Sequence, residues 1–330
     1  MKVGVLGAGS FGCSIAQVLS DNKHEVTLWS YLEEDANKLN QTRTNPYIKD
    51  AKINQDINII SDITLLKDAE MIVLVVPSFA LRTTGELLKD NGFDDKVTVI
   101  CTKGLEANSM KTGLEILKED LNFRGDVVIL SGPTHAEELA HQKFTTIVST
   151  CKNIDTAKLV QKTFNCNYLR VYTQTDVTGV EILGGAKNVL AIAAGVCDSH
   201  PFLGDNAKAA ILTRGLKELT VLGEFEGANP DTFYGLTGMG DLIVTAMSKH
   251  SRNRKFGELI GTGLTKQEAL DKIEMTVEGV NSVKALHQLK EKHDLELPII
   301  EMIYSVLEEG TSIDEAMYSI ADRGLKGEVD

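Results

Sequence analysis

Short runs of apolar residues recur through the first half of the chain, each ending at glycine or polar residues. They cover residues 2–6, 24–29, 57–60, 71–76, 97–101, 127–130 and 145–149. Runs of this length indicate strands that are buried on both faces. Residues between them, such as Phe79–Lys89, repeat their apolar positions with helical spacing. The pattern predicts an α/β fold with a doubly wound, parallel sheet.

The alternation stops near Asp176, and helical spacing continues alone from there. The predicted helices cover residues 180–197, 205–224, 251–260, 277–293 and 298–309. A chain of 330 residues is long enough for two hydrophobic cores. We therefore predict a sheet domain at residues 1–176 and an all-helical domain at residues 177–330.

A glycine motif, GAGSFG, connects the first predicted strand to the first predicted helix. Its glycines are Gly7, Gly9 and Gly12. In the order strand, GxGxxG, helix, strand, such glycines allow a tight turn and let a pyrophosphate approach the backbone at the helix N-terminus. The first domain is therefore predicted to be a Rossmann-type dinucleotide-binding domain.

The end of the second predicted strand normally distinguishes NAD from NADP. A carboxylate there binds the ribose 2′-hydroxyl of NAD, and a basic group accepts the 2′-phosphate of NADP. This chain has Trp29-Ser30-Tyr31, and its first acids, Glu33 and Glu34, come later. NAD and NADP both remain open as cofactors.

Lys187 is the most unusual charged residue, because it lies in the apolar segment VEILGGAKNVLAIAAG. A desolvated lysine titrates low enough to act as a general base. The alternative is a lysine whose stem covers an apolar helix while its ammonium reaches water. Asp241 either pairs with such a buried ammonium or caps the helix that follows it.

Several other polar residues occupy positions that suit a ligand. Lys103 and Thr134 follow predicted strands, at the edge of the sheet where such folds bind ligands. Ser251-Arg252-Asn253 combines a hydroxyl, a guanidinium and an amide at a predicted helix start. Such a group of donors suits a phosphate. The alternatives are a surface lysine at Lys103 and a capped surface helix at residue 251.

Charge and composition exclude several classes of protein. The net charge of −13 argues against binding to nucleic acid or to an anionic membrane. The five cysteines are scattered, and His135, His141, His200 and His250 lack metal-ligand spacing, so we expect reduced thiols and no metal site. We expect no membrane span, because charges interrupt the apolar runs, and no signal peptide. A cytoplasmic protein fits these features.

A series of motifs identifies a family that the sequence resembles. VGVLGAGSFG, TKGLE, SGPTHA, GGAKNVLAIAAG, GDNAKAAILTRGL, LTGMGDLIVT, SRNRKFG and VEGV occur in this order over nearly the whole chain. The sequence closely resembles bacterial NAD(P)-dependent sn-glycerol-3-phosphate dehydrogenases. The resemblance implies interconversion of dihydroxyacetone phosphate and sn-glycerol 3-phosphate, which supplies phospholipid synthesis. A homodimer is a family-level expectation.

The resemblance also implies roles for single residues. Lys187 would be the proton acceptor. The substrate would be held by Lys103, Gly132, Thr134, Asp241, Ser251, Arg252 and Asn253. The cofactor would be lined by Gly7, Gly9, Ser10, Phe11, Gly12, Tyr31, Lys103, Ala136, Arg252 and Glu278.

The chain departs from the family pattern at a few positions. The family usually has serine in place of Thr134, often tryptophan in place of Phe11, and a basic residue near Ser30-Tyr31. The last departure puts the common NADP preference in doubt. Two other functions fit the same plan: a dehydrogenase of another hydroxyacid, which would need a carboxylate pocket, and a nucleotide-sensing regulator without chemistry.

Overall fold

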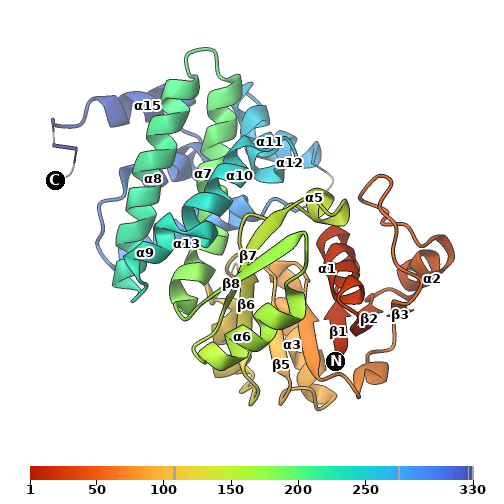
Figure 1. The fold of residues 1–330 in the computed structure, drawn as a ribbon. Helices are drawn as coiled ribbons and strands as arrows, with labels where there is room; N and C mark the ends of the chain where they lie inside the picture. Colours follow the sequence, from red (N-terminus) through yellow and green to blue (C-terminus); the bar gives the residue numbers. More distant parts are fainter. Residues whose placement is uncertain (107–108, 274–275, 326, 329–330) are drawn as a thin grey trace.

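One mostly parallel sheet organises the N-terminal half of the chain (Figure 1). The computed structural model describes residues 1–106, 109–273, 276–325 and 327–328. In this part of the chain, the sheet has eight strands in the order β3-β2-β1-β4-β5-β6-β7-β8. The strands are β1 (Lys2–Leu6), β2 (Glu25–Trp29), β3 (Asn58–Ile60), β4 (Met71–Leu74), β5 (Val97–Ile100), β6 (Val127–Ser131), β7 (Thr145–Thr150) and β8 (Leu169–Gln174).

The prediction of an entirely parallel sheet is wrong at one pairing. Strands β6 and β7 run antiparallel, whereas β8 is again parallel to β7. The connection from β6 to β7 contains only the five-residue helix α5 (Ala136–Ala140), so the chain reverses there without a full helical crossover. Strand β8 was not predicted, because its residues alternate between buried and exposed positions at the edge of the sheet.

Helices cover both faces of the sheet, as the doubly wound prediction requires. Val3, Val5 and their neighbours pack with α1 on one face, whereas Leu6 and Leu74 face a second core beside α3. The helical segments are α1 (Ser10–Asp21), α2 (Glu33–Thr42), η1 (Ile63–Leu66), α3 (Ser78–Asp90), α4 (Gly113–Glu115), η2 (Ile116–Asp120) and α6 (Ile154–Phe164). This face-by-face burial confirms the predicted fold class of the first half.

Helix α7 (Val177–Ser199) is the centre of the C-terminal half, whose described residues form helices and loops but no strand. The other segments are α8 (Asp205–Phe225), α9 (Pro230–Tyr234), η3 (Leu236–Gly240), α10 (Asp241–Met247), α11 (Arg252–Gly261), α12 (Lys266–Asp271), α13 (Glu278–Lys292), α14 (Pro298–Tyr304), η4 (Ser305–Glu309) and α15 (Ile313–Ala321). The predicted division at residue 176 falls between β8 and α7, and it stays a prediction.

The close contact between α7 and α11 depends on glycine. A Cβ atom on Gly195 would lie 1.9 Å from the carbonyl oxygen of Arg254, and one on Gly257 would lie 1.9 Å from that of Ile192. Only residues without a side chain allow the two backbones to touch at these points. The segment that contains Lys187 is thereby fixed against the segment that begins at Arg252.

The expectation that no segment is long and apolar enough to cross a membrane is wrong for α7. This helix has 23 residues and a mean hydropathy of 1.5, because small apolar residues outweigh its few charges. Over the most apolar 18-residue stretch of this helix, 94% lies buried inside the protein. Such burial is typical of the core helix of a folded domain.

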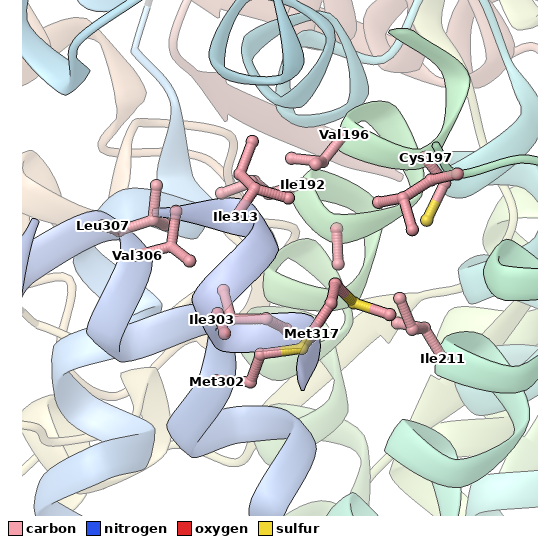
Figure 2. A pocket seen from close by; sticks show the side chains of 13 residues that line it. Ile192, Val196, Cys197, Ile211, Met302, Ile303, Val306, Leu307, Ile313 and Met317 are labelled. Atoms are coloured by element: carbon pink, nitrogen blue, oxygen red, sulfur yellow. The ribbon is translucent and has the colours of Figure 1, made fainter. Parts of the chain in front are cut away.

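An apolar cavity of about 40 Å³ lies on one side of α7, between this helix, α8 and the C-terminal helices (Figure 2). Ile192, Val196 and Cys197 of α7 face Met302 and Ile303 of α14 across it. Lys187 is not among the residues that line the cavity.

Candidate active site

The glycine motif has the geometry that a pyrophosphate needs. Gly7 has a φ of +112°, and a Cβ atom there would lie 2.5 Å from the carbonyl oxygen of Val75. A Cβ atom on Gly12 would lie 1.7 Å from the carbonyl oxygen of Gly7, so α1 packs directly on the turn. A Cβ atom on Gly9 would meet nothing within 4 Å, which leaves the N-terminus of α1 open. The loop therefore fits a dinucleotide.

The other residues predicted at the cofactor are spread along the C-terminal edge of the sheet. Ser10 and partly buried Phe11 begin α1. Ala136 lies beside them, because its carbonyl oxygen accepts a hydrogen bond from Ser14 Oγ of α1 at 3.1 Å. Tyr31 lies after β2, is 79% exposed, and its ring forms a T-shaped contact with that of Trp29.

Lys187, Asp241 and Lys103 form the centre of the site. Lys187 Nζ lies 2.6 Å from Asp241 Oδ1, and Lys103 Nζ lies 2.8 Å from Asp241 Oδ2. Lys187 and Asp241 are buried, with exposed fractions of 3% and 1%. The ammonium of Lys187 is therefore buried and does not reach water, and Asp241 pairs with it. Asp241 does not cap α10, which begins after Gly240.

Burial and pairing set the protonation of this centre. Burial lowers the pKa of Lys187 to about 7, although the negative charge of Asp241 raises it. Burial alone would raise the pKa of Asp241, but its ion pairs with Lys103 and Lys187 outweigh burial and lower that pKa. Asp241 therefore stays ionised, whereas Lys187 exchanges its proton near neutral pH.

Thr245 completes the centre and was not predicted. Lys187 Nζ donates a hydrogen bond of 2.7 Å to Thr245 Oγ1, and the threonine hydroxyl donates to the carbonyl oxygen of Asp241 at 2.6 Å. Thr245 follows Asp241 by four residues, which puts both side chains on one face of α10. This spacing is the signal by which the sequence could have indicated Thr245.

Gly132 and Thr134 lie beside this centre, after β6. Lys103 Nζ donates to the carbonyl oxygen of Gly132 at 3.0 Å, and Thr134 Oγ1 donates to the same oxygen at 3.1 Å. His135 follows, and burial lowers the pKa of its imidazole. The loop after β6 therefore places the Thr134 hydroxyl and the Gly132 carbonyl oxygen next to Lys103, one of the two lysines that pair with Asp241.

The start of α11 lies close to this centre. Asn253 donates to Asn188 Oδ1 at 2.9 Å, and Asn188 directly follows Lys187 on α7. Ser251 caps α11 by accepting from Arg254 N at 3.2 Å. Arg252 is exposed, and among the described residues it has no ion pair. A hydroxyl, a guanidinium and a helix N-terminus thus lie near Asn188, the residue that follows Lys187.

Glu278 connects the helical half to the edge of the sheet. Its Oε2 accepts a hydrogen bond of 2.7 Å from Ser78 Oγ, at the start of α3. The backbone N–H of the next residue, Gly279, donates to Asn253 Oδ1 at 2.9 Å. Glu278 therefore lies where the two halves of the chain meet.

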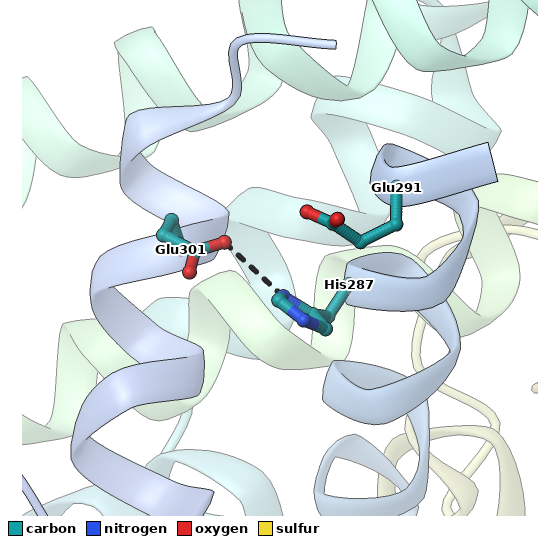
Figure 3. A group of neighbouring side chains, drawn as sticks. All are labelled: His287, Glu291 and Glu301. Atoms are coloured by element: carbon teal, nitrogen blue, oxygen red, sulfur yellow. Dashed lines mark hydrogen bonds and ion pairs between the residues drawn. The ribbon is translucent and has the colours of Figure 1, made fainter. Parts of the chain in front are cut away.

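One group of side chains elsewhere has the geometry of a metal site. His287 and Glu291 of α13 face Glu301 of α14, and their ligand atoms lie within 4.8 Å of one another (Figure 3). The ammonium of Lys290 already pairs with Glu291 at 2.9 Å and with Glu301 at 3.0 Å. This ammonium neutralises the charge that a metal ion would need, so we assign no metal to the group.

A glycine-rich loop at the edge of a Rossmann-type sheet and a buried, paired lysine where the sheet half meets the helical half are the features of a nucleotide-dependent dehydrogenase. Comparison with known proteins gives the family. The model of the NAD-dependent glycerol-3-phosphate dehydrogenase N-terminus matches residues 2–157, and that of the C-terminus matches residues 176–318. The chain belongs to the NAD-dependent glycerol-3-phosphate dehydrogenase family.

Relatives of known name cover the chain from end to end. It is 44% identical to the NAD(P)+ glycerol-3-phosphate dehydrogenase of Lysinibacillus sphaericus, over 100% of this chain and 98% of the relative. It is 42% identical to that of Oceanobacillus iheyensis, over 100% and 96%. The crystal structure of the glycerol-3-phosphate dehydrogenase from Coxiella burnetii superimposes with a TM-score of 0.91 at 31% identity, over 98% and 99%. The resemblance and the NAD(P)-dependent enzyme class predicted from the sequence are confirmed.

Proposed function

We propose that this enzyme interconverts dihydroxyacetone phosphate and sn-glycerol 3-phosphate with Lys187 as the proton donor and acceptor. The observation that carries the proposal is the buried ion pair of 2.6 Å between Lys187 Nζ and Asp241 Oδ1. A buried lysine with a pKa of about 7 has both protonation states available near neutral pH. That property is what a reversible alcohol–ketone reaction requires.

Lys187 handles the proton of the reaction. When the secondary alcohol is oxidised, neutral Lys187 accepts the hydroxyl proton as the C2 hydrogen leaves as hydride. In the reverse direction, the ammonium of Lys187 polarises the ketone and protonates the oxygen that becomes the hydroxyl. The nicotinamide, when bound, supplies or accepts the hydride.

Asp241 and Lys103 set the charge around Lys187. The carboxylate of Asp241 lies between the two ammonium groups, at 2.6 Å and 2.8 Å, and keeps each oriented. Lys103, whose side chain is 22% exposed, is the more accessible of the two lysines. We infer that Lys103, Gly132 and Thr134 contact the polar end of the substrate next to Lys187.

The phosphate end of the substrate is assigned to the start of α11. Arg252 is exposed there, and the hydroxyl of Ser251 accepts the N–H of Arg254 but keeps its own proton to donate. Asn253 keeps one amide hydrogen, since it uses the other on Asn188. Together with the positive end of the helix, these donors suit a phosphate dianion in an otherwise acidic protein.

The cofactor is assigned to the loop of Gly7, Gly9 and Gly12, with the residues predicted around it. NAD and NADP both remain candidates, because Ser30-Tyr31 offers neither a carboxylate nor a cation. The product would supply phospholipid synthesis in the cytoplasm. A homodimer remains a family-level expectation.

A direct assay tests this function. Purified protein is mixed with dihydroxyacetone phosphate, once with NADH and once with NADPH, and nicotinamide absorbance is followed. We expect oxidation of at least one cofactor, and the ratio of kcat/KM gives the preference. Unphosphorylated dihydroxyacetone is the control and should react far more slowly. No oxidation with either cofactor would contradict the function, and equal rates with both ketones would contradict the phosphate site.

A further inference from the structure

Ser78 and Glu278 make a hydrogen bond between residues 200 positions apart in the sequence, at the boundary between the sheet and the helices. Ser78 is the first residue of α3, directly after the loop that leaves β4, and it is only 5% exposed. Glu278 is the first residue of α13. The sequence alone gives no reason to connect them.

The loop that carries Lys103 passes through the same point. Gly104 has a φ of +108°, and a Cβ atom there would lie 3.4 Å from Glu278 Oε2 and 3.8 Å from Ser78 Cβ. On the other side, a Cβ atom on Gly185 of α7 would lie 3.1 Å from Gly104 Cα. Gly104 is therefore enclosed by the starts of α3 and α13 and by the helix of Lys187.

Further contacts hold these segments in place. Thr102 Oγ1 donates to the carbonyl oxygen of Val76 at 2.6 Å, which joins the ends of β4 and β5. Ser282 Oγ donates to the carbonyl oxygen of Glu278 at 3.1 Å, within the first turns of α13. The first contact lies within the sheet half and the second within α13, so the hydrogen bond from Ser78 joins the start of α3 to the start of α13 and orients the side chain of Glu278.

The Ser78 hydroxyl supplies that orientation. It donates a hydrogen bond to Oε2 of Glu278, and the described part of the chain offers no hydrogen-bond partner to Oε1. The N-terminus of α3 also favours a carboxylate at this place, since the positive end of the helix dipole points toward it. One carboxylate oxygen is therefore held by the protein, and the other is left to accept a hydrogen bond from a ligand.

We propose that Ser78 is a positioning residue, which holds Glu278 so that its Oε1 accepts a hydrogen bond from a hydroxyl of the bound nicotinamide cofactor. This rests on the proposed function, in which Glu278 lines the cofactor site. A carboxylate that is fixed in advance loses less entropy on binding, so the contribution of Ser78 is to cofactor affinity. It does not take part in proton transfer, which belongs to Lys187.

The test is Ser78→Ala, compared with Thr83→Ala, which removes an exposed hydroxyl from the same helix. Cofactor binding is measured by nicotinamide fluorescence, and the steady-state constants are measured with both substrates. For Ser78→Ala we expect the Kd and KM of the cofactor to rise about 10- to 100-fold, the effect of losing a hydrogen bond to a charged group. The kcat and the KM of the phosphorylated substrate should stay within about twofold, as should all constants of Thr83→Ala.

Glu278→Ala and the double variant make the test specific. If Ser78 acts through Glu278, the double variant should bind the cofactor no more weakly than Glu278→Ala does. A double variant whose cofactor Kd rises by the product of the two single-variant increases would overturn the proposal. An unchanged cofactor Kd in Ser78→Ala with an unchanged Tm would also overturn it. A lower kcat with an unchanged cofactor KM would also overturn it. If the wild-type enzyme binds the cofactor but reduces no dihydroxyacetone phosphate, the proposed function fails, and the binding comparison still tests Ser78.

Discussion

Asp241 Oδ1 lies 2.6 Å from Lys187 Nζ, and neither side chain is exposed by more than 4%. A buried ion pair of this kind contributes little net stability, because desolvation of both charges offsets their attraction. Its consequence is chemical: it holds an amine with a pKa of about 7 at the contact between the two halves of the chain.

Replacement of Lys187 by alanine should abolish turnover while cofactor binding is retained. The variant lacks the group that exchanges the substrate proton, a role that typically contributes about 10²- to 10⁴-fold in rate. It also leaves the carboxylate of Asp241 paired with Lys103 alone, so some loss of stability is expected. The checks are steady-state activity, nicotinamide fluorescence and circular dichroism. A folded variant with wild-type activity would remove Lys187 from the mechanism.

The pH dependence of the two reaction directions should be opposite. Neutral Lys187 is needed for oxidation, so kcat/KM for the alcohol should rise as pH increases through about 7. Protonated Lys187 is needed for reduction, so kcat/KM for the ketone should fall over the same range. In Asp241→Asn the carboxylate no longer raises the pKa of Lys187, and both transitions should move to lower pH. Unmoved transitions would show that another group titrates.

Arg252→Ala should weaken binding of the phosphorylated substrate much more than it changes kcat. Loss of a charge-assisted contact to a phosphate corresponds to about a 10- to 100-fold rise in KM. Lys255→Ala is the matched control, because this exposed lysine of the same helix pairs with Glu258 at 3.2 Å. Measuring KM for dihydroxyacetone phosphate in both variants separates a local contact from the general basic charge. Equal effects would place the phosphate elsewhere.

The sequence predicted the elements of the fold well where burial is complete. Strands β4 and β6 are buried at every residue and the long helix α7 at nearly every one, so their apolar patterns are unambiguous. Strand β8 has exposed residues such as Arg170 and Tyr172 on one side, and its short alternation did not indicate a strand. The antiparallel direction of β7 depends on how the chain returns after α5, which local patterns do not contain.

The sequence indicated which residues belong to the site, but not which of them pair with one another. Lys187 and Asp241 each left two interpretations open, because the choice depends on a partner far away in the sequence. Lys103 and Asp241 are 138 positions apart, and only folding brings them to 2.8 Å. Thr245 was missed for the opposite reason: its spacing from Asp241 is local, but threonine in a helix is usually a structural residue.

The apolar cavity beside α7 should accept an additional methyl group (Figure 2). Val196→Ile adds one methylene toward a space of about 40 Å³, so the free energy of unfolding should rise by about 0.8 kcal/mol. Val221→Ile, in α8 and outside the cavity lining, is the control. Urea unfolding of both variants measures the difference. A decrease for Val196→Ile would show that the cavity walls do not leave the required room.

Glu181 should make the protein less stable as pH rises toward neutrality. Burial raises the pKa of this carboxyl to about 7, although the backbone N–H of Leu114 donates to its Oε1 at 2.8 Å. In the unfolded chain the group ionises near pH 4.5, so between these values the native state binds more protons than the unfolded state. Stability therefore falls across this window, by on the order of 1–3 kcal/mol for this one group.

Glu181→Gln tests this directly, because its carbonyl oxygen still accepts the N–H of Leu114 and it does not ionise. Relative to the wild type, the variant should gain free energy of unfolding between about pH 5 and pH 8. Glu119→Gln, which removes an exposed carboxyl in η2, should change little at either pH. The measurement is urea unfolding of the three proteins at both pH values. A difference between Glu181→Gln and the wild type that does not grow with pH would mean that Glu181 is already ionised in the folded protein at pH 5.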